Sequence, residues 1–152
     1  MRKKIGFVII SILLVWCLAG CGQSFSNGEK YLLEGAHGTH QWGESMEQAE
    51  KIGYRSKIYG YDVSSGYGTD LGNNGLSEIY YSLIMEMNDA DKAYKKITEN
   101  LKKEMGNPQN EEKDFVRFEE NGTVINIQLH RMKFEGSTGN WAITIEMIHS
   151  NN

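Results

Sequence analysis

The stretch from Asn88 to Met105 constrains the fold most, because its apolar residues recur with the period of an α-helix. The members of this stripe are Ala90, Ala93, Tyr94, Ile97, Leu101 and Met105. Asn88 stands where it can cap the first turn, and Gly106-Asn107-Pro108 ends the pattern. The pattern predicts a helix over residues 89–105 with one apolar face. Such a helix needs a second layer of structure to cover that face.

Three segments after this helix have the composition and alternation of β-strands. Asn121-Gly122, between the first two, is the strongest short signal for a hairpin turn. With this turn, Phe118 faces Ile125 across the hairpin. Val116 then faces Ile127, so the turn predicts a register in which apolar residues lie opposite apolar residues.

The last of these three segments, 141–147, follows an expected turn over 134–140 and alternates apolar and polar residues. Segment 78–87, before the helix, alternates in the same way, and residues 56–63 are rich in aromatic and β-branched side chains. We therefore expect an α+β fold. Its core would be an antiparallel sheet of about five strands with the long helix packed across one face.

A second, shorter helix is expected near residues 46–52. Ser45 and Gln48 have the spacing of a capping box, and Gly53 follows as a C-terminal stop. The segment 64–75 contains four glycines and is expected to be a long loop.

The first residues have the pattern of an export signal. Arg2, Lys3 and Lys4 form a positive start, and Ile5 to Trp16 is almost wholly apolar. This apolar run is shorter than the roughly 20 residues that a membrane-spanning helix needs. The segment is therefore expected to direct export.

The signal ends in Leu18-Ala19-Gly20-Cys21, which resembles the lipobox of bacterial lipoproteins. The resemblance implies transfer of a diacylglyceryl group to the Cys21 thiol and cleavage after Gly20. It also implies a cell-membrane protein that is lipid-anchored and faces the extracytoplasmic side. An uncleaved signal anchor and an ordinary secreted protein are the alternatives. The expected organisation is a signal peptide over 1–20, a flexible tether over 21–30 and a single domain over 31–152.

Processing would also change the charge of the chain. Loss of residues 1–20 removes three of the 16 basic residues and none of the 20 acidic ones, so the net charge falls from −4 to −7. A domain of this charge is repelled by nucleic acid, which is not an expected partner. Both cysteines, Cys17 and Cys21, lie in the first 21 residues, so the mature domain contains no disulfide.

His37, His40 and Glu44 are the weak candidates for a metal site, because imidazole and carboxylate groups are common zinc ligands. The segment that carries them is rich in glycine, lacks helical periodicity and has no third histidine or cysteine nearby. Solvated loop histidines are the favoured interpretation. No cofactor and no catalytic residue is expected.

Tyrosines gather in and around the glycine-rich segment. Tyr59, Tyr61 and Tyr67 are the candidates for contacts with a partner, because tyrosine anchors protein interfaces at low entropic cost. Packing of these rings within the sheet is the alternative.

The leading hypothesis is a lipid-anchored, non-catalytic binding module that engages a protein or a component of the cell envelope. An immunity or exclusion lipoprotein would be one case of such a module. The alternative is a small lipoprotein hydrolase or a metal-dependent enzyme that uses His37 and His40. A solute-binding receptor is disfavoured, because a domain of this size leaves little room for a cleft between lobes.

Overall fold

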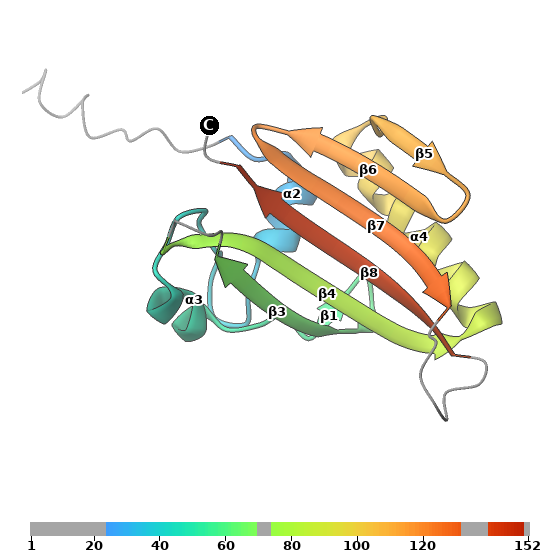
Figure 1. Ribbon diagram of the computed structural model, residues 1–152, viewed down its shortest axis with the longest axis horizontal. Coiled ribbons are helices and arrows are strands. Elements are labelled where there is room, and N and C mark those ends of the chain that lie inside the picture. The colour runs from blue at the N-terminus through green and yellow to red at the C-terminus, as the bar shows by residue number, and fades with distance from the viewer. Residues whose placement is uncertain (1–23, 70–73, 132–139, 151–152) are drawn as a thin grey trace, which may run out of the picture.

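The computed structural model describes residues 24–69, 74–131 and 140–150. Its helices are α2 (Asn27–Leu33), α3 (Met46–Ile52) and α4 (Met87–Met105). Its strands are β1 (Lys57–Ile58), β2 (Tyr61–Asp62), β3 (Ser64–Thr69), β4 (Leu76–Glu86), β5 (Asn110–Glu112), β6 (Phe115–Glu120), β7 (Thr123–Arg131) and β8 (Asn140–His149). The predicted α+β class is confirmed (Figure 1).

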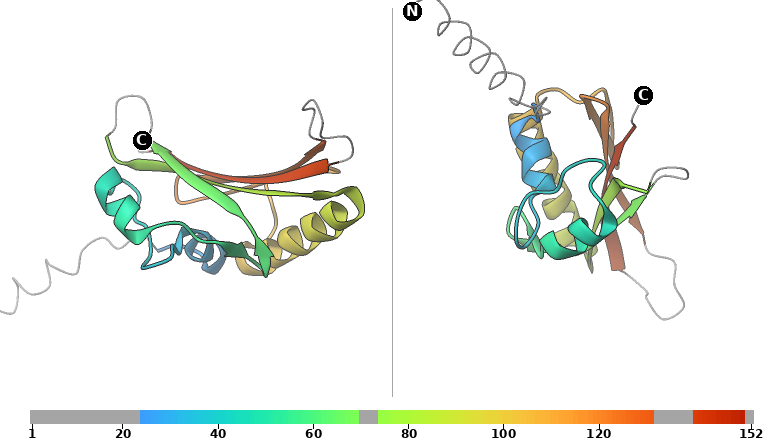
Figure 2. Two further views of the ribbon diagram at one scale, coloured as in Figure 1. Left: turned by 90° about the horizontal axis from the view of Figure 1, so that it is seen from below. Right: turned by 90° about the vertical axis from the view of Figure 1, so that its left-hand side faces the viewer.

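The main sheet has six antiparallel strands in the order β3-β4-β8-β7-β6-β5, and β1 and β2 form a separate two-stranded hairpin. The helices lie together on one side of the main sheet (Figure 2). Helix α4 crosses that side with its apolar stripe inward, and Ala90, Ala93, Ile97 and Leu101 are fully buried. Burial of a side chain such as Ile97 stabilises the fold by about 1.5–3 kcal/mol.

The predicted hairpin is also confirmed. Asn121 (φ 50°) and Gly122 (φ 77°) have the positive φ angles that this turn requires. Phe118 pairs with Ile125, and Val116 pairs with Ile127.

The short helix is confirmed as α3, from Met46 to Ile52. The hydroxyl group of Ser45 accepts a hydrogen bond from the backbone N–H of Gln48 at 3.2 Å, as the capping box predicts. Gly53 ends the helix with a φ of 72°.

The prediction that Asn88 caps the long helix is wrong. Strand β4 ends at Glu86 and α4 begins at Met87, so Glu86 occupies the capping position and its side chain makes no cap hydrogen bond. Strand pairing of Glu86 with Asn140 determines where the helix can start.

The glycine-rich segment was expected to be a loop, but its first part is the edge strand β3, which pairs with β4. Only glycine fits at position 66 of β3, because a Cβ atom there would lie 2.3 Å from the Tyr80 hydroxyl oxygen. The aromatic ring of Tyr80 therefore occupies the space above the edge strand. Residues 70–73 of the expected loop lie outside the described part of the chain.

Residues 56–63 form two short strands where one was expected, because the chain turns at Tyr59 (φ 47°) and Gly60 (φ 90°). The turn expected over 134–140 lies, except for Asn140, outside the described residues.

The tether expected over 21–30 is shorter than predicted, because residues 27–30 belong to α2. Ser26 caps this helix through its hydroxyl group, which accepts from the N–H of Glu29 at 3.2 Å. Gly28 and Glu29 are buried, and Gly28 lies close to Leu101 and Met105 of α4. Because Gly28 has no side chain, α2 can pack closely against α4. This tertiary contact stabilises α2, which is too short to form a helix alone.

Glu29 carries a buried carboxyl group beside Thr123, Trp42 and Glu120. Burial raises the pKa of Glu29; contacts with Thr123 and Trp42 offset part of this effect, and the Glu120 carboxylate adds to it. The folded state therefore binds this proton more tightly than the unfolded state does.

We expect the free energy of unfolding to fall as the pH rises from the ordinary pKa of glutamate, 4.5, through the higher pKa of Glu29 in the folded state. Glu29→Gln removes this titration. The stability of the variant relative to the parent should therefore increase with pH across that window, as measured by urea unfolding at a series of pH values. Glu47→Gln, on the exposed face of α3, is the control and should leave the profile unchanged. A pH-independent difference for Glu29→Gln would contradict the prediction.

Candidate functional site

The main sheet has one face that the described helices do not cover, which we name the open face (Figure 2). Strand alternation determines its residues. In the central strands β4 and β8 they include Tyr80, Ser82, Ile84, Thr144, Glu146 and Ile148. Three of these residues have large hydrophobic side chains that are unusually accessible to solvent: Tyr80 is 47% exposed, Ile84 57% and Ile148 40%. Polar residues separate the three side chains along the strands, so they offer a partner separate hydrophobic contact points on one face.

A shallow groove of about 310 Å³ lies on the open face. Its lining is formed by Glu78, Tyr80, Tyr81, Phe115, Asn126, Gln128, Thr144 and Glu146. The amide nitrogen of Asn126 donates to a Glu146 carboxylate oxygen at 3.1 Å, which fixes both side chains. The groove therefore combines aromatic surface with oriented polar groups, as binding sites do.

The open face is rigid, because β4 and β8 are paired continuously from Glu78–Ile148 to Glu86–Asn140. The ring of Tyr80 has a defined place over Gly66. A binding surface whose side chains are already ordered loses little conformational entropy when a partner docks.

A larger cleft of about 500 Å³ separates α4 from the β5–β6 hairpin. Tyr94 and Thr98 form part of its wall, and burial raises the pKa of the Tyr94 hydroxyl to about 12. Lysines and carboxylates alternate along its rim, and Lys102 pairs with Glu111 across it at 2.5 Å. This cleft therefore presents no single sign of charge to a ligand.

The three tyrosines predicted from the sequence as partner contacts each make contacts within the fold. Tyr59 stacks on Tyr31 with a centroid distance of 4.7 Å, and its hydroxyl group donates to Glu104 at 3.1 Å. Burial and the Glu104 carboxylate both raise the pKa of Tyr59. Tyr59 therefore connects the β1–β2 hairpin to α2 and α4.

Tyr61 and Tyr67 are half-buried. The ammonium group of Lys96 lies 5.0 Å from the centre of the Tyr61 ring. Tyr67 stacks on Tyr54 at 4.3 Å and lies 5.6 Å from the ring of His40. Burial raises the pKa of Tyr67 to about 12. Tyr67 pairs with Ile79, whose side chain is in the core, so it points away from the open face.

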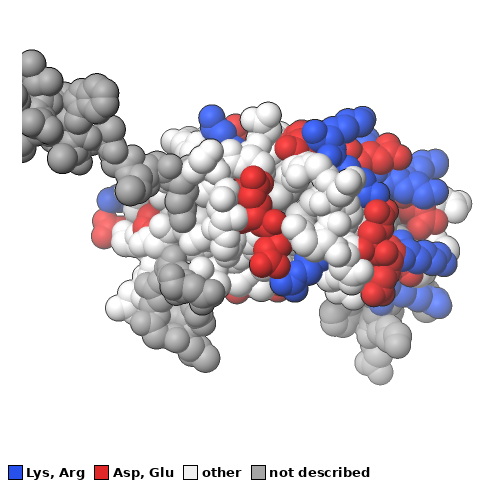
Figure 3. All heavy atoms as spheres, turned by 90° about the horizontal axis from the view of Figure 1, so that it is seen from above, with Lys and Arg blue, Asp and Glu red and all other residues white. Residues whose placement is uncertain are grey.

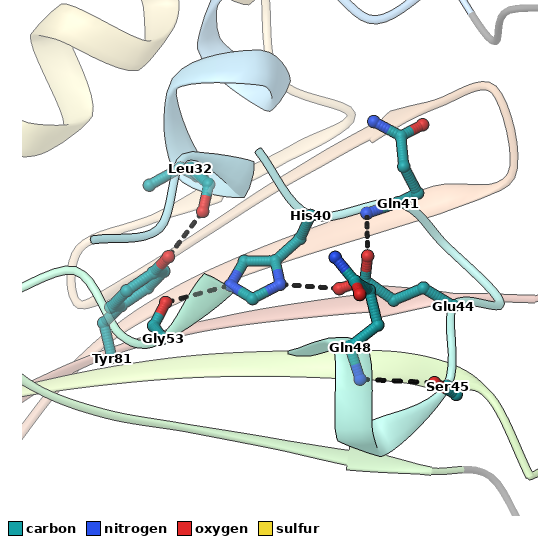
Figure 4. A network of polar contacts seen from close by, with 8 residues as sticks. All are labelled: Leu32, His40, Gln41, Glu44, Ser45, Gln48, Gly53 and Tyr81. Atoms are coloured by element: carbon teal, nitrogen blue, oxygen red, sulfur yellow. Dashed lines mark hydrogen bonds and ion pairs between the residues drawn. The ribbon is translucent and has the colours of Figure 1, made fainter. Parts of the chain in front are cut away.

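The structure does not bring His37 and His40 together as a pair of ligands. His37 is exposed, whereas His40, whose polar contacts are drawn in Figure 4, is only 2% exposed. The prediction that both are solvated loop histidines is therefore wrong for His40. The described residues contain no group of three or more His, Cys, Asp or Glu side chains arranged to hold a metal ion.

Both ring nitrogens of His40 have partners within the fold. Nδ1 lies 2.7 Å from Glu44 Oε1, and Nε2 lies 3.2 Å from the carbonyl oxygen of Gly53. Both partners are acceptors, so the ring makes both hydrogen bonds when each nitrogen carries a proton. The other Glu44 oxygen accepts from the N–H of Gln41 at 3.2 Å. His40 therefore joins the loop after α2 to the end of α3, and neither of its ring nitrogens is directed at a ligand.

His149, the last residue of β8, is buried. Its Nδ1 lies 3.0 Å from the hydroxyl oxygen of Thr123, and its ring stacks on Trp42 at 5.3 Å. These contacts pack the loop before α3 against the end of β8.

No protein family matches the chain, and comparison with curated proteins and with solved structures finds no match. No helix in the described ranges has the length and apolar character needed to cross a membrane.

His40→Ala should lower the free energy of unfolding by about 1–3 kcal/mol, because it removes the partner of Glu44 Oε1 and one of the two donors to the Gly53 carbonyl oxygen. His37→Ala is the matched control and should change stability by less than about 0.5 kcal/mol. Urea denaturation of both variants measures the difference. Equal, small effects would contradict the structural role of His40.

Proposed function

We propose that this protein is an extracytoplasmic lipoprotein, held in the cell membrane by acyl chains on Cys21, and that it acts as a non-catalytic binding module. The observation that carries the binding proposal is the open face, where Tyr80, Ile84 and Ile148 are accessible on a rigid sheet. Large side chains of this kind supply most of the binding energy in protein interfaces. A protein or another component of the cell envelope would dock there.

The groove on the open face would suit a partner that presents both apolar side chains and hydrogen-bonding groups. Phe115 and Tyr80 supply aromatic surface, whereas Gln128, Thr144 and Glu146 supply polar groups. Immunity or exclusion, in which such a contact blocks an incoming protein, is one form of this function.

The enzyme hypothesis would require His37 and His40 to act on the same substrate or metal ion. The exposure of His37 and the engagement of both His40 nitrogens favour the binding proposal over that alternative.

The N-terminal peptide of the protein purified from membranes should begin at Cys21 and carry the mass of its acyl chains. Two acyl chains give stable anchoring, whereas one chain gives only marginal binding. Cys21→Ser removes the thiol that forms the thioether, so the variant should lose the acyl mass and the cleavage after Gly20. A Cys21→Ser protein that is cleaved and retained like the parent would contradict lipid attachment.

A photoreactive residue at Tyr80 should crosslink a specific partner in intact cells. Tyr54 is the matched control position, because it is equally exposed, at 47%, but contacts Tyr67 on the other side of the sheet. Ile84→Asp should lower the yield of the Tyr80 crosslink at least tenfold, since it places a charge in the apolar contact. Equal capture from the two positions, or a yield unaffected by Ile84→Asp, would rule out the open face as the binding site.

A further inference from the structure

The start of the described chain is fixed to the fold, which limits how far the domain can move from its membrane anchor. The side-chain nitrogen of Asn121 donates to the carbonyl oxygen of Ser24 at 2.7 Å. Phe25 is partly buried against the core, and Ser26 caps α2. Three consecutive residues therefore fix the start of the described chain, and Ser24 does so at the β6–β7 turn.

Only three residue steps separate Cys21 from Ser24. A fully extended chain covers at most about 3.6 Å per residue, so the two Cα atoms lie within about 11 Å of each other. If Cys21 is anchored in lipid, as we propose above, Ser24 and Asn121 must stay close to the bilayer surface. The connection is too short for the domain to turn over freely.

Several elements meet at this end of the molecule, which we name the proximal end (Figure 1). It holds the β6–β7 turn, the start of α2 and the end of α4, and Ser150 donates to the carbonyl of Gly122 beside them. The junction of β4 with α4, at Met87, lies at the opposite, distal end. Helix α4 runs between the two ends, and its 19 residues span about 28 Å.

On the face that Figure 3 draws, lysine, arginine and acidic side chains are densest on the side away from the N-terminal segment. The proximal end carries charge of both signs, because Lys103 is exposed near the end of α4 and Glu119 is exposed just before the β6–β7 turn. Exposed neutral polar residues at the proximal end include Ser24, Asn27, Asn107 and Asn121. Such side chains can hydrogen-bond to lipid headgroups.

We propose that the proximal end rests on the headgroup layer of the bilayer, with α4 and the strands of the main sheet directed away from it. This inference rests on the proposed lipid attachment. The partner of the proximal end is the lipid surface itself. The open face then points sideways along the membrane, so its protein partner must approach in the layer immediately above the bilayer.

Energy transfer to the bilayer tests this orientation. The acylated full-length protein is reconstituted in phosphatidylcholine vesicles that contain an acceptor dye on a lipid headgroup. Because Cys17 lies in the removed signal and Cys21 is acylated, an introduced cysteine is the only free thiol for the donor dye. Asn107→Cys at the proximal end and Asn88→Cys at the distal end form a matched pair, since both asparagines are exposed.

Transfer from position 107 should be several-fold greater than transfer from position 88. Insertion of about ten Gly and Ser residues between Cys21 and Ser24 adds a flexible segment with a mean span of about 17 Å and should largely remove this difference. Equal transfer from the two positions, greater transfer from position 88, or a difference that survives the insertion would overturn the orientation.

The mass of the reconstituted protein separates this inference from the proposed function. A protein without acyl mass on Cys21 overturns lipid attachment and the orientation together. An acylated protein with equal transfer from the two positions overturns the orientation alone.

Discussion

The packing of α4 across one face of the main sheet is the interaction on which the rest of the structure depends. Its fully buried residues, such as Ile97 and Leu101, meet buried side chains of the central strands, including Leu83 and Ile145. The same helix also provides the surface on which α2 docks at Gly28. Because α4 and its neighbours lie on one side only, the opposite side of the sheet stays accessible and becomes the candidate binding surface.

Buried polar groups complete the fold where short elements meet. The hydroxyl group of Tyr81 donates to the carbonyl of Leu32 at the end of α2, and His40 joins the following loop to α3. Arg55 lies over the ring of Tyr31 and pairs with Glu34. These contacts hold residues 24–62, which contribute no strand to the main sheet, and a buried donor or acceptor left unpaired would cost about 1–3 kcal/mol. Several residues that resembled candidate ligands or partner contacts therefore serve the fold.

The proposed anchor, the orientation and the open face form one functional scheme. A domain held about three residues from its lipid has little freedom to search the space above the membrane, so its binding surface is presented in a narrow layer. This restriction raises the effective concentration of the open face for a partner that lies in the same layer. A long tether would give the opposite behaviour, with a wide search volume and a low effective concentration.

The candidate site could be predicted only in part. Alternation in residues 78–87 predicts which side chains of β4 face the core, and Leu83 and Tyr81 do so. The same pattern leaves open whether the other face is covered, because that depends on where α2, α3 and α4 pack. The preference for Tyr59, Tyr61 and Tyr67 came from composition, whereas the accessibility of Tyr80 depends on the absence of a side chain at Gly66 on the neighbouring strand.

The sequence by itself determined the elements whose stability is local: the apolar stripe of α4, the capping box of α3 and the register of the β6–β7 hairpin. Helical periodicity, caps and two-residue turns involve residues only a few positions apart, so a short stretch of sequence contains all the interacting groups. Only the tertiary structure decided that Ser64–Thr69 is an edge strand, that residues 27–30 form part of a helix and that His40 is buried. Each of these depends on a distant partner: the edge strand on β4, α2 on α4, and His40 on the carbonyl of Gly53.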